Sequence, residues 1–108
     1  MELMDPEIEY VNPAGAVEPG TRRGRTTFAR AVEKVLEGWE TWQMEPEEFR
    51  AVEDQVAVVL SYRARGRGSG VEVEGRESAL WTLRDGKVCR YAWFHEPTDA
   101  LEAAGLPE

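Results

Sequence analysis

The chain has 108 residues, 42% of them hydrophobic, and a formal net charge of -8, which predicts a single domain over residues 1–108 with one small core. Such an acidic chain repels nucleic-acid phosphates and anionic membrane surfaces, so we expect neither as a partner. The chain has one cysteine and one histidine, so we expect no disulfide, no metal site and no cofactor. It has no apolar run of about 20 residues and no signal-peptide layout over residues 1–5, so we expect no membrane span and a cytoplasmic location.

The N-terminal part predicts a short strand followed by a loop. Residues 8–11 form the strand candidate, and Asn12-Pro13 stops it. Residues 12–24 contain two prolines and three glycines, a composition typical of a loop.

An amphipathic helix is predicted next, over residues 25–37. Its apolar positions follow the spacing of one helix face, and they are Phe28, Val32, Val35, Leu36 and Trp39. Charged residues occupy the other face, and Gly38 is a natural stop.

Two strand candidates follow the helix. Residues 39–52 are ambiguous, but Pro46 excludes a central strand, so we predict an edge strand with a break or bulge there. After a turn at residues 53–55, residues 56–67 alternate between two faces, and Tyr62 is on the apolar one.

The last part of the chain predicts a hairpin and a short helix. Residues 71–83 return along the sheet and residues 87–95 pair with them, because Asp85-Gly86 between alternating runs suits a type I′ turn. A terminal helix is expected over residues 97–104, with Thr98 as its cap.

One face of this hairpin mixes large aromatic side chains with small and polar ones. The alternation places on it Glu77, Ala79, Trp81, Tyr91, Trp93 and His95. Such a mixture suits the wall of a pocket better than a dry core. Together these elements predict an α+β fold in which a helix packs on the concave face of a curved antiparallel sheet.

Several segments resemble the SnoaL-like proteins of the nuclear transport factor 2-like superfamily, which includes ketosteroid isomerases and polyketide cyclases. They are Leu3-Met4-Asp5-Pro6-Glu7-Ile8-Glu9-Tyr10, Gly24-Arg25, the hairpin 81–88 and the tail 99–106. The resemblance implies a cystatin-like cone with a ligand cavity, in many members dimeric. It also implies that the chain is shortened, because two N-terminal helices of the family are not found.

The acid–base residues of the isomerases are not found either. The resemblance implies a carboxylate base just before a proline, where this chain has Asn12, and a protonated aspartate where it has Ala79. An amide cannot abstract a proton and a methyl group cannot donate one. Ketosteroid-isomerase chemistry in its known form is therefore not expected, and whether the chain is an enzyme stays open.

Candidate site residues remain on the predicted concave face. His95 and Glu77 are its titratable pair, either a base with its partner or merely polar groups at a strand end. The candidate ligand contacts are Tyr10, Asn12, Tyr62, Trp81, Tyr91 and Trp93. Trp42 and Phe28 share their character, and all the aromatic residues could equally form the core beneath the helix.

Two functions follow from these residues. The first is the binding of a small apolar molecule in a cone-shaped cavity, with any catalysis being an isomerase- or cyclase-type proton transfer through His95 and a cavity carboxylate. The second is a non-catalytic interaction module in which the aromatic residues are buried in a homodimer. A homodimer is expected in both cases, because an uncovered aromatic wall would be an exposed apolar patch.

Overall fold

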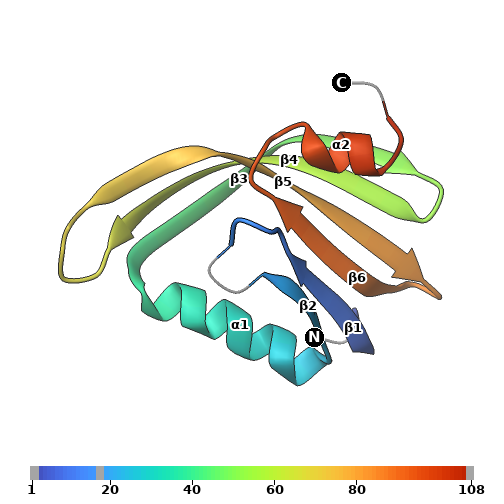
Figure 1. Cartoon of the computed structure of the whole chain (residues 1–108), viewed down its shortest axis with the longest axis horizontal. Coiled ribbons are helices and arrows are strands. Elements are labelled where there is room, and N and C mark those ends of the chain that lie inside the picture. Colours follow the sequence, from blue (N-terminus) through green and yellow to red (C-terminus); the bar gives the residue numbers. More distant parts are fainter. Residues whose placement is uncertain (1–2, 17–18, 107–108) are drawn as a thin grey trace.

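The computed structural model describes residues 3–16 and 19–106 as six strands and two helices around one curved sheet (Figure 1). The strands are β1 (Met4–Asn12), β2 (Gly20–Arg23), β3 (Trp39–Val52), β4 (Gln55–Gly66), β5 (Glu72–Arg84) and β6 (Lys87–Phe94). The helices are α1 (Arg25–Glu37) and α2 (Asp99–Ala103). The α+β class and the curved sheet agree with the sequence prediction.

The strands lie in the order β2-β1-β6-β5-β4-β3. All neighbours are antiparallel except β1 and β6, which pair in parallel. This pair departs from the wholly antiparallel sheet that was expected, because most of the chain separates the two strands and no hairpin constrains their direction. β3 forms one edge, and its register shifts between Pro46 and Glu48, so the predicted edge strand with a bulge is confirmed.

The predicted loop over residues 12–24 was wrong in part, because it contains β2. Gly20–Arg23 has no apolar alternation and gives no strand signal by itself. Pairing with β1 makes it a strand, and the exposed Arg23 guanidinium lies 3.2 Å from the Glu9 carboxylate on that neighbour. Tertiary context has overridden the local preference of the loop residues.

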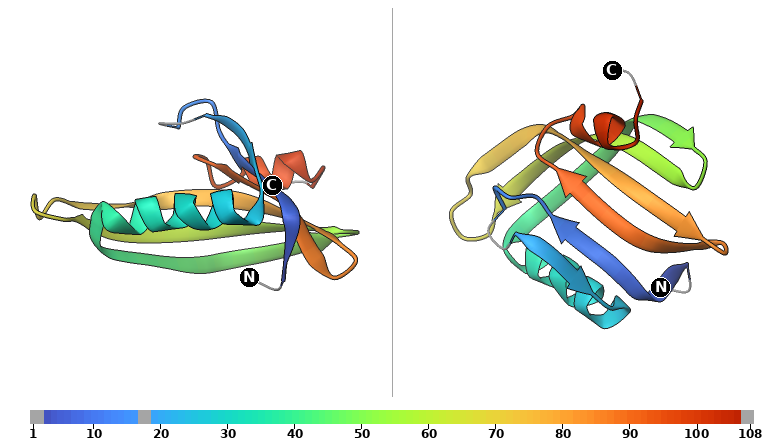
Figure 2. Two further views of the ribbon diagram at one scale, coloured as in Figure 1. Left: turned by 90° about the horizontal axis from the view of Figure 1, so that it is seen from below. Right: turned by 45° about the vertical axis from the view of Figure 1, so that its right-hand side comes forward.

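The two helices cover opposite faces of the sheet (Figure 2). Phe28 of α1 is buried against the rings of Tyr10 and Tyr91, which confirms the predicted contact between the helix and the concave face. α2 packs on the other face, which we call the outer face. Its core residues are Ala57, Val59, Leu80, Ala100 and Leu101.

The closing hairpin has the predicted turn and the predicted aromatic face, although its register shifts between Thr82 and Leu83. Trp81 pairs with Tyr91 and Ala79 with Trp93, which places all four side chains on one face. Asp85 and Gly86 have φ values of 54° and 77°, and a type I′ turn requires positive φ at both residues.

The terminal helix is shorter than predicted and its cap is different. α2 spans Asp99–Ala103, and the Thr98 side chain makes no capping hydrogen bond. The buried Ser78 hydroxyl of β5 takes that place, because it accepts a hydrogen bond from the Ala100 amide at 3.1 Å and donates one to the Glu96 carbonyl at 2.6 Å. A residue from the sheet therefore caps the helix.

Candidate functional site

The concave face of the sheet carries rows of apolar side chains that run across the strands. From β3 to β6 these rows are Ala51–Val56–Trp81–Tyr91, Phe49–Val58–Ala79–Trp93, Pro46–Leu60–Glu77, Met44–Tyr62–Gly75 and Trp42–Ala64–Val73. Tyr10 of β1 extends the first row, because it pairs with Tyr91. Among these paired positions Glu77 is the only charged side chain.

An inner group of aromatic rings lies where α1 meets the sheet. The Tyr10 and Tyr91 rings are parallel, with centroids 5.8 Å apart, and the Trp81 ring lies 4.4 Å from that of Tyr91. Burial, the nearby Glu77 carboxylate and Tyr10 together raise the pKa of Tyr91 above its ordinary value. Three predicted ligand contacts are therefore brought together, and Tyr91 is a neutral phenol at any physiological pH.

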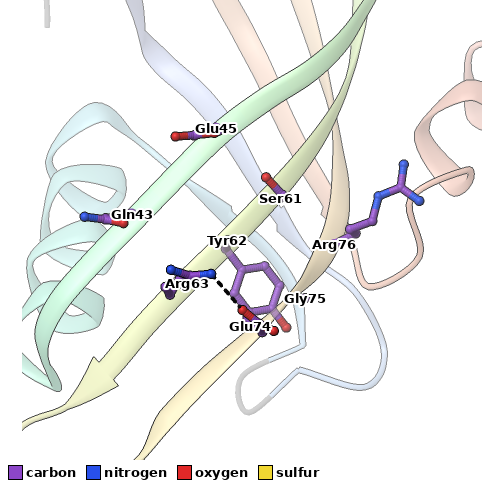
Figure 3. Close-up of a pocket in the computed structure, with 8 residues that line it drawn as sticks. All are labelled: Gln43, Glu45, Ser61, Tyr62, Arg63, Glu74, Gly75 and Arg76. Carbon is purple, nitrogen blue, oxygen red and sulfur yellow. Dashed lines mark hydrogen bonds and ion pairs between the residues drawn. The ribbon is translucent and has the colours of Figure 1, made fainter.

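A second group of aromatic rings lies on the same concave face, further along β3 and β4. The Trp42 and Tyr62 rings are parallel at 6.2 Å, and Trp39 lies 5.8 Å from Trp42. A Cβ built on Gly75 would lie only 2.7 Å from the Tyr62 hydroxyl oxygen, and Figure 3 shows the Tyr62 ring directed toward Gly75. Glycine at position 75 thus lets the Tyr62 ring cross from β4 to β5.

Glu77 lies between the two aromatic groups. It pairs with Leu60 on β4, and its neighbours two residues along β5 are Gly75 and Ala79. Its side chain is half-buried, and burial raises the pKa of the carboxyl above its usual value. Within residues 3–16 and 19–106 the Glu77 carboxyl has no hydrogen bond or ion pair.

The other titratable candidate, His95, lies beyond the end of β6. It is exposed, its ring makes an edge contact with Trp93 at 4.9 Å, and its Nε2 lies 3.2 Å from a Cβ built on Gly15. No hydrogen bond or ion pair joins His95 to Glu77 in the described part of the chain. Trp93 Nε1 donates a 2.6 Å hydrogen bond to the Asn12 side-chain oxygen, so these two predicted contacts do meet.

The sheet also has an open hollow of about 530 Å³ in another place (Figure 3). It is lined by Gln43, Glu45, Ser61, Tyr62, Arg63, Glu74, Gly75 and Arg76. Gln43 and Arg63 pair across the strands, as do Arg63 and Glu74, and they alternate with the concave rows, so they belong to the outer face. Two other lining residues, Tyr62 and Gly75, are members of the concave rows. This polar hollow is not the aromatic cavity that the sequence predicts.

Ion pairs neutralise most of the charge around the hollow. Arg63 is 3.2 Å from Glu74, and Arg76 is 2.9 Å from Glu47. All four side chains are well exposed, and such pairs contribute only about 0.2–1 kcal/mol each. Arg63 and Arg76 therefore lie on a solvated strand face.

Sequence reasoning missed three members of the concave rows. Leu60 lies in the alternating run 56–67 but was given no role in the site, Phe49 belonged to an ambiguous segment, and Gly75 gave no signal. The bulge at Pro46 shifts the alternation of β3, which is why Phe49 joins a row with Val58 rather than facing outward. An explicit register that included the bulge could have found Phe49.

Metal-binding groups and membrane-spanning helices are both absent from the part of the chain that the structure describes. No group of three or more His, Cys, Asp or Glu side chains within ranges 3–16 and 19–106 is placed to hold a metal ion. Neither described helix is long and apolar enough to cross a membrane. What the concave face offers chemically is aromatic and aliphatic surface around one carboxyl.

Solved structures similar to this chain share the same fold. An NTF2-like protein from Burkholderia thailandensis E264 is 27% identical, with a TM-score of 0.79, covering 99% of this chain and 82% of that one. A protein from Jannaschia sp. CCS1 named "putative SnoaL-like polyketide cyclase" is 20% identical, with a TM-score of 0.78, covering 99% of this chain and 76% of that one. TerC, crystallised with polyporic acid, is 24% identical, with a TM-score of 0.75, covering 95% and 81%.

The sequence comparisons give the family. No curated protein matches the chain significantly. The family model described as the SnoaL-like domain matches residues 1–91, which span the sheet from β1 to most of β6. The chain therefore belongs to the SnoaL-like domain family.

Proposed function

We propose that this chain binds a small, largely apolar molecule on the concave face of its sheet. The main support is the set of five rows of side chains on this face, in which Glu77 is the only charged residue. Ligand sites are mostly apolar, with a few polar groups that fix orientation, and Glu77 is suited to that task. The co-crystallisation of the structural neighbour TerC with polyporic acid is consistent with an organic ligand.

Glu77 is also the group that we propose for any isomerase- or cyclase-type proton transfer. Burial raises the pKa of its carboxyl, and a general acid or base works best when its pKa approaches the working pH. His95, exposed beside Trp93, would act at the rim. A Glu77→Gln or His95→Ala variant with undiminished turnover would remove the corresponding residue from the mechanism.

Binding on the concave face can be tested by filling it. The neutral fluorescent probe N-phenylnaphthylamine is expected to bind the wild-type protein. Leu60→Trp adds bulk at a half-buried position between Pro46 and Glu77, and it should weaken probe binding by about tenfold or more, equal to about 1.4 kcal/mol.

The matched control lies one residue further along the same strand. Ser61 is on the outer face and lines the polar hollow, so Ser61→Trp should leave the affinity within about twofold. If Ser61→Trp abolishes binding and Leu60→Trp does not, the ligand binds in the outer hollow and the proposal is wrong. Absence of probe binding to the wild-type protein would also contradict it.

A second candidate function is the homodimeric interaction module. The exposed apolar side chains that favour it are Val32, Val35, Leu36, Met44 and Phe49. The first three are on α1 and the last two are on β3, so apolar surface is exposed on both elements. Contact with a second copy would bury these side chains and gain hydrophobic free energy.

The oligomeric state tests the dimer. Native mass spectrometry should find a dimer at micromolar concentration, and Leu36→Glu should dissociate it because a charge would be buried in the contact. Glu33→Lys on the same helix should leave a dimer of this kind intact. A wild-type protein that stays monomeric at every concentration would contradict this candidate.

A further inference from the structure

The concave face combines one carboxylate with an otherwise uncharged surface. The rows on either side of Glu77 contain only apolar or aromatic side chains and Gly75. Same-face neighbours along a strand are about 6.7 Å apart. A ligand lying over Glu77 therefore also contacts the adjoining rows, and its polar group has a single charged partner.

Aromatic rings border this carboxylate on both sides. The Tyr62 ring reaches over Gly75, which is one of the two same-face neighbours of Glu77 along β5. On the other side, the same-face neighbour of Glu77 is Ala79, which pairs with Trp93 of β6. The faces of aromatic rings attract cations, and they contribute more when water is excluded.

The Glu77 carboxyl is also without an internal partner in the part of the chain that the structure describes. Half-buried carboxylates are normally paired or hydrogen-bonded, because burial penalises the charged form. The other candidate surface differs in this respect, since Arg63 with Glu74 and Arg76 with Glu47 already form ion pairs at the outer hollow. The remaining carboxylate of the hollow, Glu45, is exposed and solvated. A cation at the half-buried Glu77 would therefore relieve a burial penalty that the outer carboxylates do not carry.

From this arrangement we propose that the ligand is a hydrophobic organic cation, an ammonium group carried on an apolar or aromatic body. Its nitrogen lies at the Glu77 carboxylate, its methyl or methylene groups contact the Tyr62 ring, and its apolar body covers the Leu60 row. The inference rests on the proposed function, because it requires ligand binding on the concave face. The net charge of -8 raises the local concentration of any cation, and among the concave rows Glu77 is the charged side chain that gives it a defined position.

The test compares two ligands of equal shape and different charge. Benzyltrimethylammonium and neopentylbenzene, its neutral carbon isostere, compete against bound N-phenylnaphthylamine. On the wild-type protein the cation should compete about tenfold more strongly. In Glu77→Gln this preference should disappear, while competition by neopentylbenzene should change less than about twofold.

The control removes the same charge from the same strand. Glu74 is on β5, but it pairs with Arg63 on the outer face, so Glu74→Gln should leave the cation preference unchanged. Glu77→Asp keeps the charge on a shorter stem and should keep part of the preference. Circular dichroism spectra of all variants, compared with that of the wild type, confirm that they are folded.

The possible results separate this inference from the proposed function. If the isostere competes as well as the cation on the wild-type protein, the inference is overturned and apolar binding stands. If the preference survives in Glu77→Gln, or is lost equally in Glu74→Gln, overall charge causes it and the assignment to Glu77 is wrong. If the neutral probe does not bind at all, the proposed function itself fails.

Discussion

Glu77 shows how a single residue can carry an energetic penalty that a ligand would relieve. Its carboxyl is half-buried among apolar neighbours, and burial raises its pKa above the usual value of 4.5. A raised pKa in the folded state means that the charged form destabilises the fold relative to the unfolded chain. Below the pKa of the unfolded chain the penalty is absent, and it grows as the pH rises through the folded value.

Replacing this carboxyl should therefore stabilise the protein at high pH. We expect Glu77→Gln to raise the free energy of unfolding at pH 8, and the gain should shrink as the pH falls toward 4.5, because the wild-type carboxyl becomes neutral there. Urea unfolding at a series of pH values measures it. A gain that is constant with pH would show that the charge of the carboxylate is not its cause, and a loss at pH 8 would show that the carboxylate has a favourable partner.

Among the elements, α2 depends on one residue of the sheet. Ser78 is fully buried, donates a hydrogen bond to the Glu96 carbonyl and accepts one from the Ala100 amide. A helix of five residues has little stability by itself. Its position over β4 and β5 therefore depends on these bonds and on the packing of Leu101.

Removing the Ser78 hydroxyl should loosen α2. Ser78→Ala leaves buried polar groups unpaired, which costs about 1–3 kcal/mol, and hydrogen exchange in α2 should accelerate. Thr98→Ala is the control, because the Thr98 side chain makes no capping bond, and it should change stability by less than about 0.5 kcal/mol. If Thr98→Ala lowered the free energy of unfolding more than Ser78→Ala, the assignment of Ser78 as the cap of α2 would be wrong.

The sequence predicted the elements whose signals are local. Asp85-Gly86 defines its turn by φ preference, and the spacing of Phe28 and Val32 defines α1 by its periodicity. The parts that were missed depend on contacts between distant residues. β2 exists because it pairs with β1, and α2 is capped by Ser78 rather than by Thr98.

The candidate site, like the fold, was predictable where local sequence patterns determine it and not where contacts between strands do. Trp81 and Glu77 share a face because side chains alternate along β5. Tyr91 pairs with Trp81 because the register of the hairpin shifts between Thr82 and Leu83. The bulge at Pro46 determines the face of Phe49, and the space above Gly75 is occupied by a ring from another strand. Neither feature has a counterpart in local sequence patterns.

At the scale of the whole molecule, the two faces of the sheet differ in kind. The concave face beneath α1 is apolar around one carboxyl, while the outer face has a core under α2 and exposed ion pairs beyond it. The hollow on that outer face is polar and open to solvent. Of the two faces of the sheet, the concave one therefore offers an apolar ligand the larger gain in hydrophobic free energy.

The central claim is that this concave face is the ligand site, and intermolecular NOEs test it most directly. With benzyltrimethylammonium bound, we expect NOEs from its methyl protons to the ring protons of Tyr62 and from its phenyl protons to Leu60 and Trp81. NOEs to Arg63 and Arg76 in their place, or none to the concave rows at saturating ligand, would contradict the account.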